Sequence, residues 1–415
     1  MMKKKVSLSR KMAGCLLLAV AVWMIFSPTA QATRNLPELY RIAVGQSWDM
    51  DMGIAVLSSQ DQRLLSGENG KLQALTAGET EVTVNLFGLF PVKRVRVNVE
   101  EDIRLVPGGQ AVGIALAMKG VMVVGVSDVA GQSPARQAGL QAGDVIETVN
   151  GKPVMTGEEL IALVEESKGK DMRIIFRRND EAKETVLKPQ LDKPTGVWRI
   201  GAWVRNSTAG VGTLTYYNPN DGSYGALGHA ILDADTAKLL PVRTGALMQA
   251  EIVGVKKGQK GNPGELRGSF LRNQQVLGDI QQNTVLGIYG RMDAPQSFYP
   301  EGLPVGYQES VEIGPAQILS TVDGEGVKAY DIRITHLSRQ QSAAPKSMVI
   351  RVTDPELLEK TGGIVQGMSG SPIIQNGHII GAVTHVFVDD PTQGYAVYIE
   401  WMLETEDTRA AENAA

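Results

Sequence analysis

Turn-forming residues are the feature that most limits what this chain can fold into. Its 415 residues include 46 glycines and 19 prolines, about one residue in six. Such a density favours short strands joined by turns over long helical bundles. Hydrophobic residues at 43% and charged residues at 21% are typical of a globular protein, and the length suggests roughly two to four domains. We therefore expect a mostly β protein with several domains.

Charge and metal-binding residues exclude several classes of function. The formal net charge is −4, so no basic signature indicates a nucleic-acid partner. The single cysteine, Cys15, excludes an intrachain disulfide, and with only four histidines the chain is poorly supplied for a dense metal site. We expect no metal and no cofactor.

The first 33 residues have the pattern of an export segment. Five basic residues precede an apolar run over 12–26, and the small-residue pattern Ala30-Gln31-Ala32 follows it. This order is typical of a signal peptide, and a retained membrane anchor would be oriented in the same way. Both alternatives place everything after residue 33 outside the cytoplasm. Cys15 lies at the start of the apolar run and not at its end, which argues against lipidation.

Residues 34–101 are expected to form a small β-rich module. Val95, Val97 and Val99 alternate with polar residues, as in a strand with one buried face. The module resembles a small bacterial immunoglobulin-like sandwich, and its simplest role is that of a spacer. We interpret the stretch 46–60 as an accessible loop in which a tethered endopeptidase would cut its own chain.

Residues 102–189 contain a specific spaced motif. It runs from Ser133-Pro134-Ala135-Arg136-Gln137-Ala138-Gly139-Leu140 through Gly143-Asp144-Val145-Ile146 to Asn150-Gly151. This pattern resembles a PDZ domain of the bacterial type. A helix is predicted after Thr156, which can form a capping box with Glu159. Leu160, Leu163 and Val164 would form its inward stripe.

PDZ domains bind a peptide as an additional strand beside a helix, and backbone amides of a glycine turn hold its terminal carboxylate. We interpret Gly108, Gly109, Val112, Gly113 and Ile114 as that turn and groove. The groove would take a peptide carboxy terminus or an internal segment of the same chain. In the alternative interpretation these glycines only make a tight turn.

The remaining residues, 190–415 with a start that could lie nearer 170, contain a candidate nucleophile. The loop is Gly367-Met368-Ser369-Gly370-Ser371-Pro372, before a predicted hairpin. Its glycines let the backbone point amides into one space beside the Ser369 hydroxyl, which would supply a nucleophile and an oxyanion hole together. The loop resembles the active-site loop of chymotrypsin-like serine proteases, in which the amides of Gly367 and Ser369 would face the oxyanion. A small-residue turn between strands is the alternative.

A serine nucleophile needs a base, and the four histidines are His229, His336, His378 and His385. His378 lies in a turn, and His336 and His385 lie in predicted strands, where a structural role is more common. His229 follows a glycine-flanked strand end upstream of the serine. That order is expected when base and nucleophile come from different barrels. Spacing favours His229 without deciding between the four.

Three blocks carry a resemblance to a known family: Gly225-Ala226-Leu227-Gly228-His229, residues 361–372, and Ile399-Glu400-Trp401-Met402-Leu403. With the export segment and the PDZ-like segment, the chain resembles the stage IV sporulation protein B family of endospore-forming Firmicutes. The resemblance implies a chymotrypsin-like double β-barrel peptidase domain, with His229 as general base, Ser369 as nucleophile and Asp354 as the acid. Asp354 also has the context of a helix N-cap, because Pro355 and Glu356 follow it.

The resemblance implies a regulatory serine endopeptidase that is secreted from the forespore into the space between its two membranes. There the family cuts the extracytoplasmic part of a membrane-bound regulator, which releases an intramembrane protease and permits late mother-cell transcription. Two alternatives stay open. A non-catalytic PDZ scaffold would be favoured by loss of Ser369 or His229, and both are present. A general envelope quality-control protease would place its protease domain before the PDZ domain, whereas here the PDZ-like segment comes first.

Overall fold

The computed structural model describes residues 27, 33–34, 36–49, 55–67, 71–179, 181–269 and 275–414. The chain divides into two units: residues up to Arg104 together with Pro304–Val311, and Leu105–Leu303 together with Glu312–Ala415. Both are mostly β, as predicted. The expected export segment, 1–33, lies almost entirely outside the described residues. In the ranges given above, no helix is long and apolar enough to cross a bilayer.

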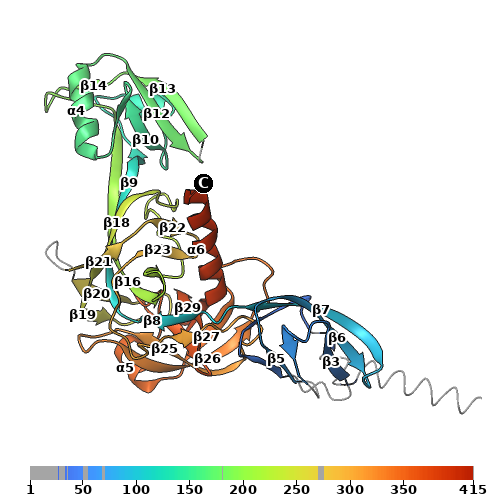
Figure 1. Cartoon of the computed structure of the whole chain (residues 1–415). Coiled ribbons are helices and arrows are strands. Elements are labelled where there is room, and N and C mark those ends of the chain that lie inside the picture. The colour runs from blue at the N-terminus through green and yellow to red at the C-terminus, as the bar shows by residue number, and fades with distance from the viewer. Residues whose placement is uncertain are drawn as a thin grey trace, which may run out of the picture. The chain divides into compact units, whose positions relative to one another are not determined.

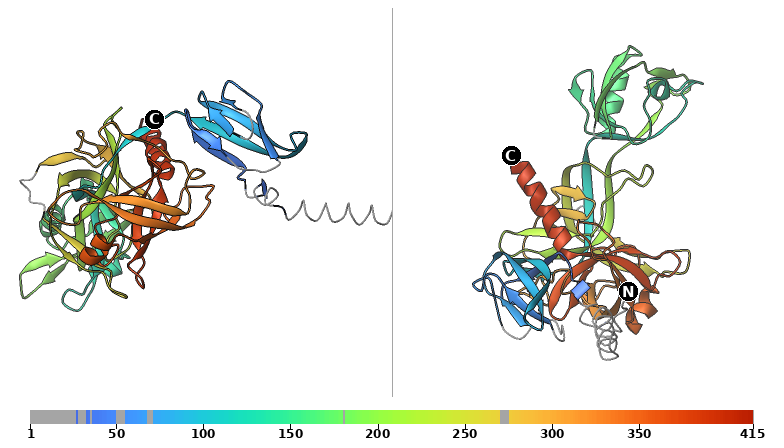
Figure 2. Two further views of the ribbon diagram at one scale, coloured as in Figure 1. Left: turned by 90° about the horizontal axis from the view of Figure 1, so that it is seen from below. Right: turned by 90° about the vertical axis from the view of Figure 1, so that its right-hand side faces the viewer.

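The amino-terminal unit is a β module built from two sheets, drawn in blue in Figure 2. Its strands are β1 (Leu39–Ala43), β2 (Ser47–Asp49), β3 (Ala55–Ser59), β4 (Leu65–Ser66), β5 (Lys71–Ala74), β6 (Gly78–Leu86) and β7 (Phe90–Glu100). One sheet has the order β1-β7-β6-β3 and the other β2-β5-β4. Val95, Val97 and Val99 of β7 are buried between the sheets, as their alternation predicts.

The stretch 46–60 is not the accessible loop expected from the sequence. Residues Ser47–Asp49 and Ala55–Ser59 form β2 and β3, and β3 pairs with β6 along its length. A protease needs an extended, unpaired segment, so these paired strands are poor cleavage sites. Residues 50–54 lie outside the described ranges.

The first barrel of the second unit carries β9 (Ala111–Val126), β16 (Ala202–Tyr217), β17 (Ser223–Ala226), β23 (Gly287–Arg291), β21 (Val276–Asp279) and β18 (Val242–Gln249). Adjacent strands pair in that order, and β18 pairs back onto β9. The bridge between Gly278 and Met292 joins β21 to the end of β23 and closes the ring. Additional strands are β8 (Arg104–Pro107), β19 (Glu251–Lys256), β20 (Glu265–Ser269), β22 (Gln282–Thr284) and β24 (Leu303–Pro304).

The PDZ-like segment is inserted into this first barrel. Its elements are α3 (Pro134–Gln137), β10 (Val145–Val149), β11 (Lys152–Pro153), α4 (Gly157–Ser167), β12 (Met172–Arg178), β13 (Glu181–Leu187), β14 (Gln190–Asp192) and β15 (Val197–Arg199). Strands β9 and β16 pair over nearly their whole length, and they belong to the barrel at one end and to the PDZ-like sheet at the other (Figure 1). The boundaries expected at 102–189 and 190–415 therefore do not follow the fold.

Helix α4 forms as the sequence predicts. The Thr156 side chain accepts a hydrogen bond from the Glu159 amide at 3.2 Å, and the Glu159 carboxylate accepts one from the Thr156 amide, which completes the capping box. Leu160 and Val164 are buried in the PDZ-like core, with Leu163 partly buried beside them.

The second barrel is closed and continuous in sequence. Its strands are β25 (Gly314–Ser320), β26 (Lys328–Leu337), β27 (Met348–Val352), β30 (Gln393–Tyr398), β29 (His378–Val386) and β28 (Pro372–Gln375), in that order around the barrel. Helix α5 (Pro355–Thr361) follows β27, and helix α6 (Ile399–Ala414) ends the chain. Two barrels in succession are the arrangement expected of a chymotrypsin-like peptidase.

Candidate active site

A cavity of about 610 Å³ is lined by residues of both barrels, including His229 and Ser369. His229 lies just after β17 of the first barrel, and Ser369 lies in the loop before β28 of the second. Thr384 and His385 of β29 line the same cavity. The fold thus brings together the two residues that the sequence predicted as base and nucleophile.

Both barrels hold the loop that carries Ser369. The Thr213 hydroxyl of β16 donates to the Gly367 carbonyl at 2.7 Å, and the Thr213 amide donates to the Ser369 carbonyl at 3.0 Å. The Gly370 amide donates to the Val383 carbonyl at 2.7 Å. Gly370 has φ of 96°, and a Cβ there would lie 2.2 Å from the Thr213 carbonyl oxygen. Only glycine fits this close approach between the barrels.

The two serines of the loop have different surroundings. The Ser369 hydroxyl faces the cavity side and donates to the Thr384 carbonyl at 2.8 Å. Ser371 is fully buried and bonds to the hydroxyl of Ser320, also fully buried, at 3.0 Å. Ser371 therefore has a structural role, and Ser369 is the serine that a substrate can reach.

The amides of Gly367 and Ser369 are the donors expected to bind an oxyanion. Within the described part of the chain, neither amide donates a hydrogen bond to another residue. Gly367 has φ of 99°, and a Cβ there would lie 3.0 Å from the Leu266 Cβ. A glycine at this position lets the loop bend beside Ser369 without displacing Leu266.

His229 has one defined hydrogen-bond partner in its own loop. Its Nδ1 lies 2.8 Å from the Ala230 carbonyl oxygen. Because a carbonyl oxygen only accepts, Nδ1 carries the proton and the lone pair is left on Nε2. Burial lowers the pKa of His229 below its ordinary value, against the opposing effect of the hydrogen bond to Ala230. At neutral pH the imidazole is therefore uncharged and can accept a proton at Nε2.

The loop between β17 and β18, residues 227–241, carries His229 and is called the His229 loop. It is anchored to β16, the strand shared with the PDZ-like sheet. Arg205 of β16 contacts the carboxylates of Asp233 and Asp235 at 2.7 Å and 2.8 Å. Asp233 also accepts hydrogen bonds from Thr236, and its side chain is fully buried. These two aspartates hold the loop and do not form a triad with His229. Lys238 reaches Asn179 of the PDZ-like segment at 3.2 Å.

His385 lies beside His229. The two ring centroids are 5.1 Å apart, with the rings tilted by 40°. Burial, followed by the nearby His229 and Lys346, lowers the pKa of His385 to about 4. His385 therefore adds no positive charge to the cavity at neutral pH, and a protonated His229 is not opposed by a second charged imidazole.

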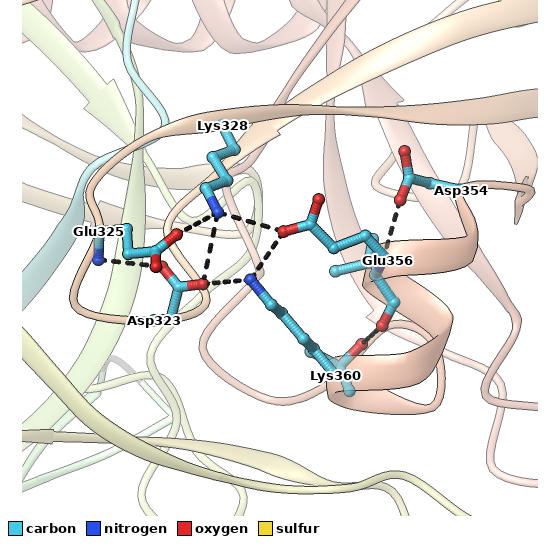
Figure 3. A network of polar contacts seen from close by, with 8 residues as sticks. Asp323, Glu325, Lys328, Asp354, Glu356 and Lys360 are labelled. Atoms are coloured by element: carbon cyan, nitrogen blue, oxygen red, sulfur yellow. Dashed lines mark hydrogen bonds and ion pairs between the residues drawn. The ribbon is translucent and has the colours of Figure 1, made fainter.

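The structure does not bring Asp354 to this cavity. The Asp354 carboxylate accepts a hydrogen bond from the Leu357 amide at 2.9 Å and caps α5. Its second oxygen accepts from the Asp331 amide at 3.3 Å. Figure 3 shows it at the start of α5, close to the ion pairs that Lys360 makes with Asp323 and Glu356. The assignment of Asp354 as the triad acid is thus not supported, because both oxygens are used by backbone amides.

The interpretation of Gly108, Gly109, Val112, Gly113 and Ile114 as a PDZ groove is wrong. Val112 and Ile114 are buried in the first barrel with Leu214, Tyr224 and Leu227, and Gly113 pairs with β16 and β18. A Cβ on Gly108 would lie 2.4 Å from the Leu214 carbonyl oxygen, and one on Gly109 would lie 2.9 Å from Leu319. Gly108 is therefore packed against β16 of the first barrel, and Gly109 lies where the two barrels meet.

The strand beside α4 is instead the start of β16, which sequence reasoning missed. Ala202–Arg205 pairs with β9 on one edge, and a Cβ on Gly157 of α4 would lie 3.6 Å from Val204 on the other side. Gly201 precedes the strand with φ of 70°. An apolar residue and a glycine before a strand, Ile200-Gly201, were the available signal.

Comparison with known proteins identifies two segments. The family model described as SpoIVB peptidase S55 matches residues 196–403, and a PDZ domain model matches residues 125–178. The chain belongs to the SpoIVB peptidase S55 family. It contains a SpoIVB peptidase S55 domain and a PDZ domain.

More distant similarities cover parts of the chain. It is 28% identical to the zinc metalloprotease RasP of Oceanobacillus iheyensis over 91 residues, which are 20% of this chain and 22% of that protein. It spans less than a quarter of the length of the curated relatives it matches. Among solved structures, the Rv3671c protease of M. tuberculosis is 15% identical, with 48% of this chain and 72% of that chain covered and a TM-score of 0.27.

The HtrA-type protease AlgW with a tripeptide is 14% identical, with 48% of this chain and 56% of that chain covered and a TM-score of 0.28. These scores are low. The double-barrel fold rests on the strand pairing described above.

Proposed function

We propose that this peptidase is a regulatory endopeptidase of sporulation in which Ser369 is the nucleophile and His229 the general base. The observation that carries the proposal is that these two side chains, from different barrels, line one cavity. In a double-barrel serine protease, the first barrel supplies the histidine and the second barrel supplies the serine.

The hydrogen bonds of the site suggest how the base works. The Ser369 hydroxyl turns from the Thr384 carbonyl toward Nε2 of His229, which takes its proton as Oγ attacks the scissile carbonyl. The Ala230 carbonyl keeps the proton on Nδ1, so it fixes the tautomer that a carboxylate fixes in other serine proteases. The imidazolium then protonates the leaving amine.

The developing oxyanion would be bound by the amides of Gly367 and Ser369. Two fixed donors of this kind stabilise the tetrahedral intermediate, and loss of one typically costs about 10² to 10³ in kcat. Water then attacks the acyl-enzyme, with His229 again accepting and returning the proton.

We propose export as the setting of this reaction. The first 33 residues have the order of a signal peptide or anchor, which would place the peptidase in the forespore intermembrane space, tethered before processing. Its substrate would be the extracytoplasmic part of a membrane-bound sporulation regulator, whose cleavage triggers intramembrane proteolysis. The non-catalytic scaffold is disfavoured by the presence of both His229 and Ser369 on one cavity.

The PDZ domain would bind a peptide carboxy terminus or an internal segment. The groove between α4 and the start of β16 is the candidate site, with Ile200-Gly201 as the turn before the strand. A peptide there would add as a further strand to the β16 edge. The peptide would then pair with the strand that carries Arg205, the residue that holds the His229 loop.

Cleavage in the host tests the proposal. In sporulating cells whose only copy carries Ser369→Ala, we expect the regulator to keep its full length and new amino termini to be missing from the outer face of the membrane. A wild-type fragment pattern in these cells would contradict it. Amino-terminal sequencing of the peptidase itself tests self-processing: we expect shorter forms beginning after residue 33, with different starting residues in wild type and Ser369→Ala. Identical starting residues would assign the trimming to signal peptidase alone.

A further inference from the structure

The hairpin between β6 and β7 ends in an exposed apolar tip. Phe87, Leu89, Phe90 and Val92 are 55%, 77%, 63% and 51% exposed, and Val56 of the neighbouring strand β3 is 38% exposed. The tip belongs to the amino-terminal β module, in which β6 and β7 are adjacent strands (Figure 1). Contiguous exposed apolar side chains on a soluble domain usually mark an interaction surface.

The core of the module does not need these side chains. Val82, Val84 and Val95 of the same two strands are fully buried. The regular pairing of β6 with β7 is interrupted between Val84 and Asn85, and every residue from Phe87 to Val92 is exposed. The apolar residues of the tip therefore lie beyond the point where the core ends.

The backbone conformation of the turn is unusual for the phenylalanine at position 87. Phe87 has φ of 53° and Gly88 has φ of 71°, so both are left-handed. The turn has three residues, 87–89, between the paired Leu86 and Phe90. Asparagine and aspartate adopt a positive φ more readily than other non-glycine residues, and a bulky residue there is uncommon. Folding alone favours asparagine at position 87. A phenylalanine there points to a contact outside the module.

The charges near the tip are positive. Lys93 and Arg94 are the charged residues of the segment 82–95, and the paired strand Ala55–Ser59 has none. Arg94 is exposed, and the Lys93 ammonium bonds to the Leu36 carbonyl. Aromatic and aliphatic side chains flanked by cations match the boundary of an anionic bilayer, where apolar groups enter the acyl region and cations stay among the headgroups.

We propose that the β6–β7 tip, residues 86–92, is a membrane-contact element that inserts shallowly into an anionic lipid surface. Phe87, Leu89 and Phe90 enter the boundary between headgroups and acyl chains, and Arg94 remains at the phosphate level. This contact would hold the β module against the membrane, where the sequence alone suggested a spacer.

The test uses the full-length protein with a fluorophore at the tip. In a Cys15→Ser background, Leu89→Cys is labelled with an environment-sensitive nitrobenzoxadiazole dye. Val186→Cys on β13 of the PDZ-like segment, where the valine is 58% exposed, is labelled as the control. We expect vesicles of equal parts phosphatidylglycerol and phosphatidylcholine to blue-shift the tip fluorophore, and acyl-chain spin labels to quench it. The control fluorophore should not respond, and pure phosphatidylcholine should give a weaker response.

A variant of the tip separates insertion from folding. Phe87→Asn with Phe90→Ser should leave the melting temperature unchanged or raise it, because asparagine suits the left-handed position. We expect it to reduce quenching at position 89 about tenfold or more. Two outcomes would overturn the proposal. One is a fluorophore that stays unquenched while the protein is bound to vesicles. The other is an equal blue shift without vesicles, which would assign the tip to a second copy or to another part of the chain.

Discussion

The two barrels differ in how the chain builds them, and the proposed base and nucleophile are divided between them. The second barrel is closed by consecutive strands from Gly314 to Tyr398, and its Ser369 loop is fixed by backbone hydrogen bonds. The first barrel is interrupted by the PDZ-like segment between β9 and β16. His229 lies on a loop that bonds to the shared strand β16 and to the PDZ-like segment itself.

This difference indicates that the base, unlike the nucleophile, is held in part by contacts with the PDZ-like segment. A cluster of Met118, Met122, Val145 and Leu240, with Ile231 partly buried beside it, joins the PDZ-like segment to the His229 loop. A change in the PDZ-like segment can therefore reach His229 through packed side chains and the Arg205 ion pairs. The hydrogen bonds that fix Ser369 come from barrel residues only.

The largest effect should come from the nucleophile. Ser369→Ala removes the attacking hydroxyl, and loss of the nucleophile lowers kcat about 10⁶-fold in serine proteases. Initial rates on a cleaved peptide measure it, with Ser371→Ala as the matched control in the same loop. Ser371→Ala should stay within about threefold of wild type at a temperature where it is folded. Comparable losses in both variants would contradict the division between the two serines.

The next effect concerns the base. Arg205→Lys keeps the positive charge, but a single ammonium cannot bridge Asp233 and Asp235 as the guanidinium does. Because small displacements of catalytic groups cost up to about 100-fold, we expect kcat to fall about 10- to 100-fold.

The control for Arg205 lies on the other barrel. Arg351→Lys alters an exposed ion pair with Asp390 at 3.8 Å and should leave kcat unchanged. Equal kcat values for Arg205→Lys and wild type would show that β16, the strand shared with the PDZ-like sheet, does not position His229.

Stability should respond to the buried hydroxyl pair of the second barrel. Ser371→Ala leaves the fully buried Ser320 hydroxyl without its partner, and an unsatisfied buried group costs about 1 to 3 kcal/mol. Denaturant unfolding monitored by circular dichroism measures the change. A variant as stable as wild type would mean that the Ser320 hydroxyl finds another hydrogen-bond partner.

A smaller loss of stability should come from the helix cap. Asp354→Ala removes the cap of α5 and should destabilise the protein by about 1 kcal/mol, whereas Asp354→Asn keeps a capping oxygen. Thermal unfolding of the two variants checks this. If Asp354→Asn folds normally but loses about 10⁴-fold in kcat, as replacement of a triad acid does, Asp354 would be restored as the third member.

The smallest effect is a shift of the pH profile. Burial lowers the pKa of His229, so the neutral base persists below the ordinary histidine pKa of about 6.5. We expect the acidic limb of kcat/KM to be centred below pH 6.5. The same depressed pKa adds stability above pH 6.5 that is lost as pH falls through the folded-state pKa. An acidic limb centred above 6.5 would contradict a buried, neutral His229.

Sequence reasoning succeeded where the signal was local. The Gly367–Pro372 loop, the Thr156 capping box and the glycine-flanked His229 each lie within a few residues, and the structure places them as expected. The N-cap interpretation of Asp354 was equally local, and it is the one that the geometry supports. The resemblance to a family added the choice of His229 among four histidines.

It failed where partners are far apart in the chain. Strand β9 reads as a continuous apolar run, and nothing in it shows that Ala111–Ala117 pairs with β16 beyond the inserted segment. Because the PDZ motif follows them in the sequence, Gly108, Gly109 and Gly113 were assigned to the PDZ domain, whereas they belong to the first barrel. The stretch 46–60 was expected to be a loop because of its small polar residues. Ser58 and Ser59 instead lie on β3, which pairs with β6 at a distance in the sequence.

Covalent labelling tests the central claim most directly. A fluorophosphonate reacts only with a serine that a base has activated, so peptide mapping of the modified protein identifies the nucleophile. We predict a single adduct on Ser369 in the wild type, none in Ser369→Ala and a strongly reduced yield in His229→Ala. An adduct on Ser371, or undiminished labelling of Ser369→Ala, would contradict the assignment of Ser369 and His229 as the catalytic pair.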